Sequence, residues 1–401
     1  MNFHYDVAIV GGGPIGSTLA YHLSKEKLNI CIIEKKKEVG FPLQCAGIVS
    51  KSIANFNEVP NDVIINKVKG AYLHSPNEIL KVQKQEEEAY VIDRISYDRF
   101  LLKRAIKNNV KLIREKVINV DYEKGTILCE SGKAIKSKII VGADGYKSKI
   151  SNILKNEYEN FHASQLLVEI SNIAINKFRK SNDLNTNEYV DTCVKEELLP
   201  GFLWFVPVEE NLFRVGLFSN HSYKEQNQFL KDFLRNNFKE DSYKILEKYK
   251  GIIPIYNDKI TLVKERVLLI GDAACQIKPT TGGGLLIGFD SCRIASEYII
   301  KAIKNNDIAI LNRYAKEFKK QYLKEFNYQF KVQKTLNILS NDDLDYFFNK
   351  LKENDCENLI SQYGDMDKQS ILIKEFIKRG LIFKVIPNFF IKIVSKIFGI
   401  K

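Results

Sequence analysis

The start of the chain contains two short apolar runs separated by a glycine-rich turn and an amphipathic segment. Residues 6–10 and 30–34 are predicted strands, 11–16 is a turn, and 17–25 has the periodicity of a helix. A strand, a helix and a second strand within about thirty residues form a βαβ unit. The pattern therefore predicts a nucleotide-binding half at the beginning of the chain.

Beyond this unit, strand and helix periodicities follow one another along the chain. We predict strands at 66–92, 111–120, 138–141, through most of 160–260 and at 267–270, and helices at 96–108 and 285–303. In the strand-rich part, two alternating runs flank Glu209, Glu210 and Asn211, which predicts a hairpin. Beyond residue 307 the pattern is helical and basic.

This order predicts an α/β fold with three parts. Residues 1–155 and 262–305 would form a discontinuous, Rossmann-like dinucleotide-binding domain. Residues 156–261 would form an antiparallel-sheet substrate domain, and 306–401 a helical C-terminal part.

The turn after the first strand carries the glycine spacing of a dinucleotide fingerprint. Gly11 allows a tight turn, Gly13 lets the backbone approach a pyrophosphate, and Gly16 allows close packing of the helix. Glu34 ends the second strand, where its carboxylate would accept a ribose hydroxyl and repel a 2′-phosphate. A glycine turn without a ligand is the alternative, but the strand, helix and acid together favour a dinucleotide. We also expect cofactor contacts from Pro14, Ile15 and Lys35.

Two further turns combine glycine with aspartate after buried strands. Asp144 lies in the sequence GADGxxS, and Asp272 lies in GDAA. With the fingerprint, these turns resemble the FAD-dependent oxidoreductases of the p-hydroxybenzoate-hydroxylase-like fold over about residues 5–300. The resemblance implies that FAD is the cofactor and that the first predicted domain binds it. It also implies FAD contacts from Arg94, Val117, Asp144, Asp272, Gly283, Gly284 and Leu285. For Asp144 and Arg94 the alternatives are a turn cap and an exposed residue at a helix start.

Three segments narrow the resemblance. Residues 44–48 (QCAGI), 199–207 (LPGFLWFVP) followed by 214–216 (RVG), and 279–285 (PTTGGGL) are similar to segments of geranylgeranyl reductases, most closely of archaeal digeranylgeranylglycerophospholipid reductases. That family saturates isoprenoid chains of membrane lipids, and its Cys-containing loop lies beside the flavin. Phe202 replaces the usual tyrosine, and Cys275 stands where glycine is common.

The resemblance implies an FAD-dependent reductase that acts on the double bonds of geranylgeranyl chains in ether phospholipids. Such an enzyme needs an apolar tunnel that excludes water. We expect Phe202, Trp204, Phe205 and Pro207 to line this tunnel, although alternating aromatic residues are also typical of an ordinary sheet core.

The seven cysteines contain no CxxC pair, so we expect neither a disulfide framework nor a metal site. Cys45, with Ala46 and Gly47, is predicted to contact the cofactor, and its thiol is also a candidate proton donor. A buried, inert cysteine is the alternative. Whether Cys45 pairs with Cys292 stays open.

Composition and charge add expectations about partners. The 401 residues include 61 Lys and Arg against 49 Asp and Glu, a formal net charge of +12. No nucleic-acid module is recognisable, so we expect no nucleic-acid partner and relate the charge to lipid phosphate or a membrane surface. The apolar, lysine-rich stretch 381–398 suits an anionic membrane surface, or equally a terminal helix packed on the domain. We find no signal peptide and expect a cytoplasmic, peripherally membrane-associated protein.

The electron donor, ferredoxin or NAD(P)H, is left open because only one complete dinucleotide fingerprint is present. Two other functions also stay open. One is an FAD-dependent monooxygenase or halogenase of the same fold, because 202–207 approximates the halogenase WxWxIP pattern without its first tryptophan. The other is a quinone-linked electron-transfer flavoprotein, although no iron–sulfur cysteine cluster is present.

Overall fold

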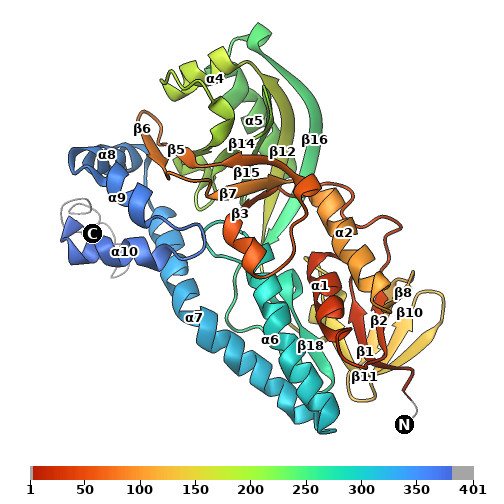
Figure 1. Cartoon of the computed structure of the whole chain (residues 1–401). Helices are drawn as coiled ribbons and strands as arrows, with labels where there is room; N and C mark the ends of the chain where they lie inside the picture. The colour runs from red at the N-terminus through yellow and green to blue at the C-terminus, as the bar shows by residue number, and fades with distance from the viewer. Residues whose placement is uncertain (1–2, 382–401) are drawn as a thin grey trace.

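The computed structural model describes residues 3–381 and contains two large sheets joined by helices (Figure 1). The first sheet has the order β17-β18-β11-β1-β2-β8, with β10 paired to β11 and β9 to β10. Its strands are β1 (Tyr5–Val10), β2 (Ile30–Ile33), β8 (Lys111–Ile113), β9 (Val117–Asp121), β10 (Thr126–Cys129), β11 (Ala134–Gly142), β17 (Val263–Lys264) and β18 (Val267–Leu269).

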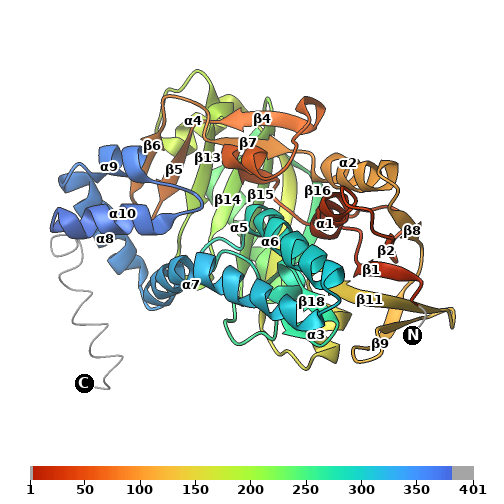
Figure 2. The same cartoon turned by 60° about the horizontal axis from the view of Figure 1, so that its bottom comes forward.

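The centre of the first sheet is parallel and fully buried. The central pairs β1–β2, β1–β11 and β11–β18 are parallel. Helices must therefore cover this part of the sheet, and its strands read as continuous apolar runs. Helices α1 (Pro14–Leu23) and α6 (Leu285–Lys304) lie side by side on one face (Figure 2). The remaining helices of this part are α2 (Arg94–Lys107) and α3 (Lys149–Ile153). The predicted βαβ unit and the return of residues 267–303 to this sheet are both confirmed.

The second sheet has the order β16-β12-β15-β14-β13-β5-β6. Its strands are β5 (Gly70–His74), β6 (Ile79–Gln83), β12 (Asn160–Ile170), β13 (Tyr189–Cys193), β14 (Leu203–Glu209), β15 (Leu212–Ser219) and β16 (Tyr243–Pro254). All pairs are antiparallel except β13 with β5. One face packs on α5 (Tyr223–Asn237), and α4 (Asn172–Arg179) lies beside it. The predicted hairpin is confirmed, because β14 ends at Glu209 and β15 begins at Leu212.

The structure differs from three sequence-based expectations. Strands β5 and β6, which the predicted division placed in the dinucleotide domain, belong to the second sheet. The predicted strand 111–120 is two strands, because β8 pairs with β2 whereas β9 turns away to pair with β10. Helix α2 begins at Arg94 rather than residue 96, because the Asp93 carboxylate accepts the N–H groups of Ile95 and Ser96 as an N-cap. We retain the three-part division as a proposal, with 70–83 moved to the substrate sheet.

A third, small sheet has the order β3-β7-β4. It comprises β3 (Ile48–Ser50), β4 (Ile64–Val68) and β7 (Ala89–Ile92). Single 3₁₀ turns connect many elements: η1 (Lys51–Asn55), η2 (Asn61–Val63), η3 (Thr186–Glu188), η4 (Glu196–Leu198), η5 (Glu240–Ser242), η6 (Gly271–Ala274) and η7 (Ile308–Ile310).

Four helices form the C-terminal part: α7 (Leu311–Leu336), α8 (Asn341–Glu353), α9 (Cys356–Tyr363) and α10 (Gln369–Lys378). They extend from α6 to the β5–β6 edge of the second sheet (Figure 1). Within residues 3–381, no helix is long and apolar enough to cross a membrane. All but the first residue of the predicted membrane-surface stretch 381–398 lies outside the described residues.

Candidate active site

A cavity of about 1600 Å³ lies between the two large sheets and the C-terminal helices. Its lining begins at the glycine turn after β1, passes the start of α6, and continues along β14, β15, α7 and α10. Ligand pockets for a single small molecule commonly measure about 300–1,000 Å³. The cavity is therefore large enough for a dinucleotide together with a second, elongated ligand.

The glycine turn leaves the N-terminus of α1 open toward the cavity. Gly13 is the N-cap residue, no side chain caps the helix, and a Cβ at this position would meet no atom within 4 Å. Gly11 has φ +106°, and a Cβ there would lie 2.3 Å from the Ala143 carbonyl oxygen. The turn therefore presents free N–H groups and the positive end of the helix dipole, an arrangement that binds phosphate.

The Glu34 carboxylate is buried beside this turn, as expected for the acid after the second strand. The N–H groups of Gly12 and Lys36 donate to its two oxygens, each over 2.7 Å. These bonds orient the carboxylate in the cavity lining, where an acceptor for a ribose hydroxyl is expected.

The two downstream turns reach the same cavity. The Asp144 carboxylate accepts the Ser148 hydroxyl (2.6 Å) and the Lys149 N–H (2.7 Å), so it holds the start of α3 as a turn cap. Burial raises the pKa of Asp144 although these donors favour its ionised form. Burial also raises the pKa of Asp272, and the charge of Arg94 opposes that shift.

Residues 278–284, called here loop 278–284, lead into α6. Gly284 is the N-cap residue and no side chain caps this helix either, so a second helix N-terminus opens onto the cavity. A Cβ at Gly284 would lie 3.0 Å from Asp272 Oδ1. Thr281 Oγ1 is buried without a hydrogen-bond partner and belongs to the cavity lining. This loop therefore offers polar groups that the protein itself does not satisfy.

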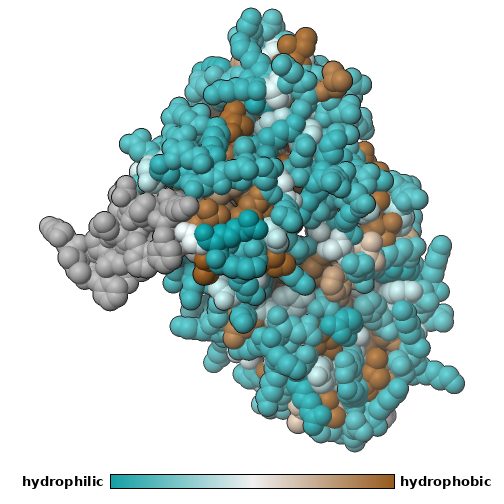
Figure 3. Space-filling view, turned by 60° about the vertical axis from the view of Figure 1, so that its left-hand side comes forward, coloured by the Kyte–Doolittle hydropathy of each residue, from teal (hydrophilic) through white to brown (hydrophobic). Residues whose placement is uncertain are grey.

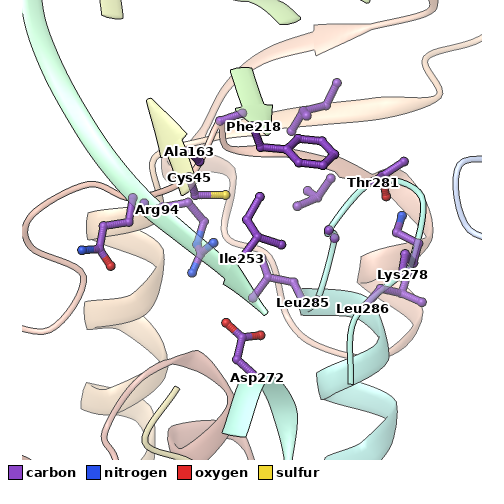
Figure 4. Close-up of a pocket in the computed structure, with 18 of the residues that line it drawn as sticks. Cys45, Arg94, Ala163, Phe218, Ile253, Asp272, Lys278, Thr281, Leu285 and Leu286 are labelled. Atoms are coloured by element: carbon purple, nitrogen blue, oxygen red, sulfur yellow. The ribbon is translucent and has the colours of Figure 1, made fainter. Parts of the chain in front are cut away.

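The predicted Arg94 lies at the first turn of α2 and lines the cavity. Its Nε donates to Asp98 Oδ1 over 3.2 Å, within a nearly buried ion pair. Burial raises the pKa of Asp98, and Arg94 opposes that shift. The ion pair fixes the guanidinium near Cys45, on one side of the cavity, whereas Lys278 and Thr281 lie on the other (Figure 4).

The loop that carries Cys45 is held from the second sheet. Arg214, on β15 and nearly buried, donates from Nη1 to the carbonyl oxygens of Ala46 (2.8 Å) and Ile92 (3.3 Å). The Gly47 N–H points to Cys45 Sγ over 3.3 Å. The motif RVG identified this segment as similar to one of the reductase family, but nothing in the sequence indicated which loop Arg214 would contact.

Cys45 and Cys292 are both free in the structure. The Cys292 thiol is fully buried between α6 and α1 and donates to the Ile15 carbonyl oxygen over 3.2 Å. Burial raises the pKa of Cys292. The structure therefore does not form the pairing that the sequence left open.

The four predicted tunnel residues divide between the two faces of the second sheet. Phe202 and Trp204 line the cavity, whereas Phe205 packs on the opposite face against Phe233 and Phe238. Pro207 is also outside the lining. The assignment of Phe205 and Pro207 was wrong because successive side chains of a strand point to opposite faces.

Residues of neighbouring strands complete this part of the wall. Trp204 Nε1 donates to Gln165 Oε1 over 3.1 Å, and Gly216, opposite Trp204, leaves space for the indole ring. Val206 and Phe218 add apolar surface. Val206 follows Trp204 by two positions and could have been found by strand alternation. The residues on neighbouring strands could be identified only once the register of the strands was known.

The C-terminal helices supply a wall that sequence analysis did not identify. Apolar lining residues from this part are Val332, Leu336, Leu339, Phe347, Ile360, Met366, Leu372, Ile373 and Phe376. In the space-filling view with the left-hand side of Figure 1 turned forward, patches of hydrophobic residues lie within a largely hydrophilic surface (Figure 3). No pattern in the sequence distinguishes these side chains from the ordinary apolar faces of packed helices.

Most other predicted site residues are brought together in the cavity lining. These are Gly11, Gly13, Pro14, Ile15, Glu34, Lys35, Cys45, Ala46, Arg94, Val117, Asp144, Asp272, Gly283, Gly284 and Leu285. Gly16 and Gly47 lie behind the lining, where a Cβ at Gly16 would approach the Gly11 carbonyl oxygen to 2.0 Å. Contacts of these residues with a cofactor stay predictions. Within residues 3–381, no cluster of metal-binding side chains is present.

The chain is similar to proteins of known families. The family model described as lycopene cyclase protein matches residues 6–359. A protein of Methanocaldococcus jannaschii named uncharacterized protein MJ1520 is 33% identical, with 96% of this chain and 98% of that protein covered. The digeranylgeranylglycerophospholipid reductase of the same organism is 30% identical, with 88% of this chain and 92% of that protein covered.

Solved structures share the fold. The geranylgeranyl bacteriochlorophyll reductase-like protein of Thermoplasma acidophilum matches with a TM-score of 0.79 at 24% identity, covering 93% of this chain and 98% of that chain. Halogenase PltM in complex with phloroglucinol and FAD matches with a TM-score of 0.68 at 16% identity, covering 90% of this chain and 84% of that chain. At these identities the matches establish the fold, which is the predicted one.

Proposed function

This chain belongs to the lycopene cyclase family, and it is also similar to digeranylgeranylglycerophospholipid reductases over most of its length. We therefore propose that it is an FAD-dependent reductase. Its substrate would be the geranylgeranyl chains of ether phospholipids, whose double bonds it saturates. The observation that carries the proposal is the single cavity, which joins a dinucleotide site to a long apolar wall.

The residues at the end of the cavity beside the glycine turn fit FAD. Two uncapped helix N-termini, the open backbone at Gly13, the carboxylate of Glu34 and the unpartnered hydroxyl of Thr281 are polar features that an FAD molecule would satisfy. When bound and reduced, FAD supplies a hydride to an alkene carbon. The N–H groups at Gly13 would hold the pyrophosphate, and those at Gly284 would stabilise negative charge on the reduced flavin ring.

The residues at the other end fit an apolar chain. Phe202, Trp204 and Phe218 exclude water from one side, and the apolar side chains of α7 and α10 exclude it from the other. Exclusion of water prevents competing proton transfer. Packing against these apolar side chains would hold the alkene in place. The Cys45 thiol lies in the lining near Arg94 and is proposed as a cofactor contact, with proton donation from Sγ as a second role.

We further propose that ferredoxin or NAD(P)H supplies the electrons and that the protein works in the cytoplasm at the membrane surface, where its lipid substrate is found. The basic net charge supports contact with anionic lipid. Binding to vesicles of anionic phospholipid, compared with vesicles of neutral phospholipid, tests this part of the proposal. Equal binding to both would contradict it.

The absorbance spectrum of the purified protein tests the proposed chemistry. Dithionite reduction under anaerobic conditions should bleach the flavin, and added digeranylgeranylglyceryl phospholipid should restore the oxidised spectrum without oxygen. A monooxygenase or halogenase would instead recover its oxidised flavin only with oxygen. A quinone-linked electron-transfer protein would recover it with a quinone and leave the lipid unchanged.

A further inference from the structure

Loop 278–284 is joined to the C-terminal part by a nearly buried ion pair. Lys278 Nζ lies 2.9 Å from Asp367 Oδ1 and donates to the Met366 carbonyl oxygen, also over 2.9 Å. The two side chains are 11% and 15% exposed. Ser52 Oγ donates to the other Asp367 oxygen over 3.1 Å. Hydrogen bonds between ionised groups with little access to water are stronger than neutral ones.

The next two residues of the loop are bonded to the same part of the chain. Gln333 Nε2, on α7, donates to the Pro279 carbonyl oxygen. Gln369 Nε2, at the start of α10, donates to Thr280 Oγ1 over 2.8 Å. Three consecutive loop residues, 278–280, are therefore held by side chains or backbone of residues 333–369.

The elements that hold the loop also form the apolar wall. Val332 and Leu336 line the cavity from α7, next to Gln333, and Leu372 and Phe376 line it from α10, which begins at Gln369. The other end of loop 278–284 is the N-terminus of α6, where the flavin is proposed to bind. A change in the position of this loop is therefore transmitted to the wall through fixed bonds rather than through solvent.

We propose that Lys278 and Asp367 are positioning residues that couple the binding of FAD to the binding of the apolar chain. This inference rests on the proposed function, because it assigns FAD to loop 278–284 and the chain to the wall of α7 and α10. Coupling between two ligands is reciprocal. FAD should therefore order the wall, and an apolar chain against the wall should strengthen FAD binding by the same factor.

Titration of the apoprotein with oxidised FAD, with and without saturating geranylgeraniol, measures this factor without any turnover. In the wild type we expect geranylgeraniol to lower the FAD Kd about tenfold, within the common range of about 5- to 150-fold for coupled sites. Lys278→Met, which keeps the apolar stem, and Asp367→Asn should each reduce the effect to about twofold or less. Both variants are first checked for wild-type circular dichroism.

Lys352→Met is the matched control. Lys352 pairs with Glu78 over 2.6 Å and joins α8 to the turn between β5 and β6, so it holds the same C-terminal part but not loop 278–284. This variant should keep the full coupling. Hydrogen exchange gives a second readout: FAD alone should slow exchange in α10 of the wild type and of Lys352→Met, but not of Asp367→Asn.

The possible failures are distinguishable. A wild-type protein that binds FAD and geranylgeraniol independently overturns the inference and leaves the proposed function intact. Coupling that persists in Lys278→Met and Asp367→Asn overturns the role of this ion pair. A protein that does not bind FAD, or does not bind geranylgeraniol, contradicts the proposed function and the inference with it.

Discussion

Replacement of Gly13 by alanine should separate FAD binding from folding. Gly13 has φ −68° and ψ −176°, which alanine adopts without strain, and the added Cβ would meet no atom within 4 Å. Gly→Ala changes at compatible positions stabilise proteins by about 0.4–1 kcal/mol, because they restrict the unfolded chain. The apoprotein of Gly13→Ala should therefore unfold at the wild-type temperature or slightly above it.

The same Cβ would occupy the space through which the backbone approaches a pyrophosphate. Inserting a methyl group into a well-packed contact costs about 1–3 kcal/mol. This cost raises the Kd for FAD by about 5- to 150-fold, because 1.4 kcal/mol corresponds to about a factor of ten. Fluorescence titration of the apoprotein with FAD measures the change.

Gly16→Ala is the matched control for Gly13→Ala. Its Cβ would lie 2.0 Å from the Gly11 carbonyl oxygen, so this variant should lose about 1–3 kcal/mol of folding free energy in the absence of FAD. The reasoning is refuted if Gly13→Ala binds FAD as tightly as the wild type. It is equally refuted if the Gly13→Ala apoprotein is destabilised as much as that of Gly16→Ala.

Two further predictions concern the second sheet. Trp204→Leu should raise the KM for the lipid about tenfold or more, because the Trp204 side chain lines the cavity and donates to Gln165. Phe205→Leu, on the opposite face, should lower the unfolding temperature and leave KM unchanged. Equal KM values for the two variants would contradict the assignment of faces. Arg179→Met should cost about 3–5 kcal/mol of unfolding free energy at pH 7, because Arg179 and Asp191 form a fully buried ion pair. Burial alone would raise the pKa of Asp191, but Arg179 and His74 hold this pKa below its usual value. The stabilisation by the ion pair is therefore present above about pH 4 and is lost as the pH falls through the folded-state pKa of Asp191. Denaturant unfolding at pH 7 and near pH 3 should therefore show a smaller difference between wild type and variant at the lower pH, and an equal difference would contradict this assignment.

The parts of the fold that local physics determines could be predicted from the sequence. The glycine turn could be placed between a strand and a helix because its spacing puts Gly16 against the Gly11 carbonyl oxygen, a contact that only glycine fits. The hairpin at Asn211, where φ is +60°, follows from the polar residues between two alternating runs. These features depend on neighbours in the chain, so composition and spacing are sufficient.

The parts that depend on distant contacts could not be predicted. Alternation along β14 separates Phe205 and Pro207 from Trp204, but which of the two faces covers the cavity depends on how the sheet packs. Strands β5 and β6 join the second sheet through a parallel pairing with β13, more than a hundred residues away. The ion pair of Lys278 with Asp367 spans 89 residues, and neither residue lies in a recognisable motif position.

The mass of the lipid tests the central claim most directly. FAD-loaded protein, reduced with dithionite without oxygen in deuterated water, is incubated with digeranylgeranylglyceryl phospholipid, and the lipid is analysed by mass spectrometry beside a sample without protein. The account predicts that each saturated double bond gains two deuterium atoms, one as hydride from the exchanged flavin N5 position and one as a proton. A reducible flavin together with a lipid of unchanged mass would contradict the assignment of this protein as an isoprenoid reductase.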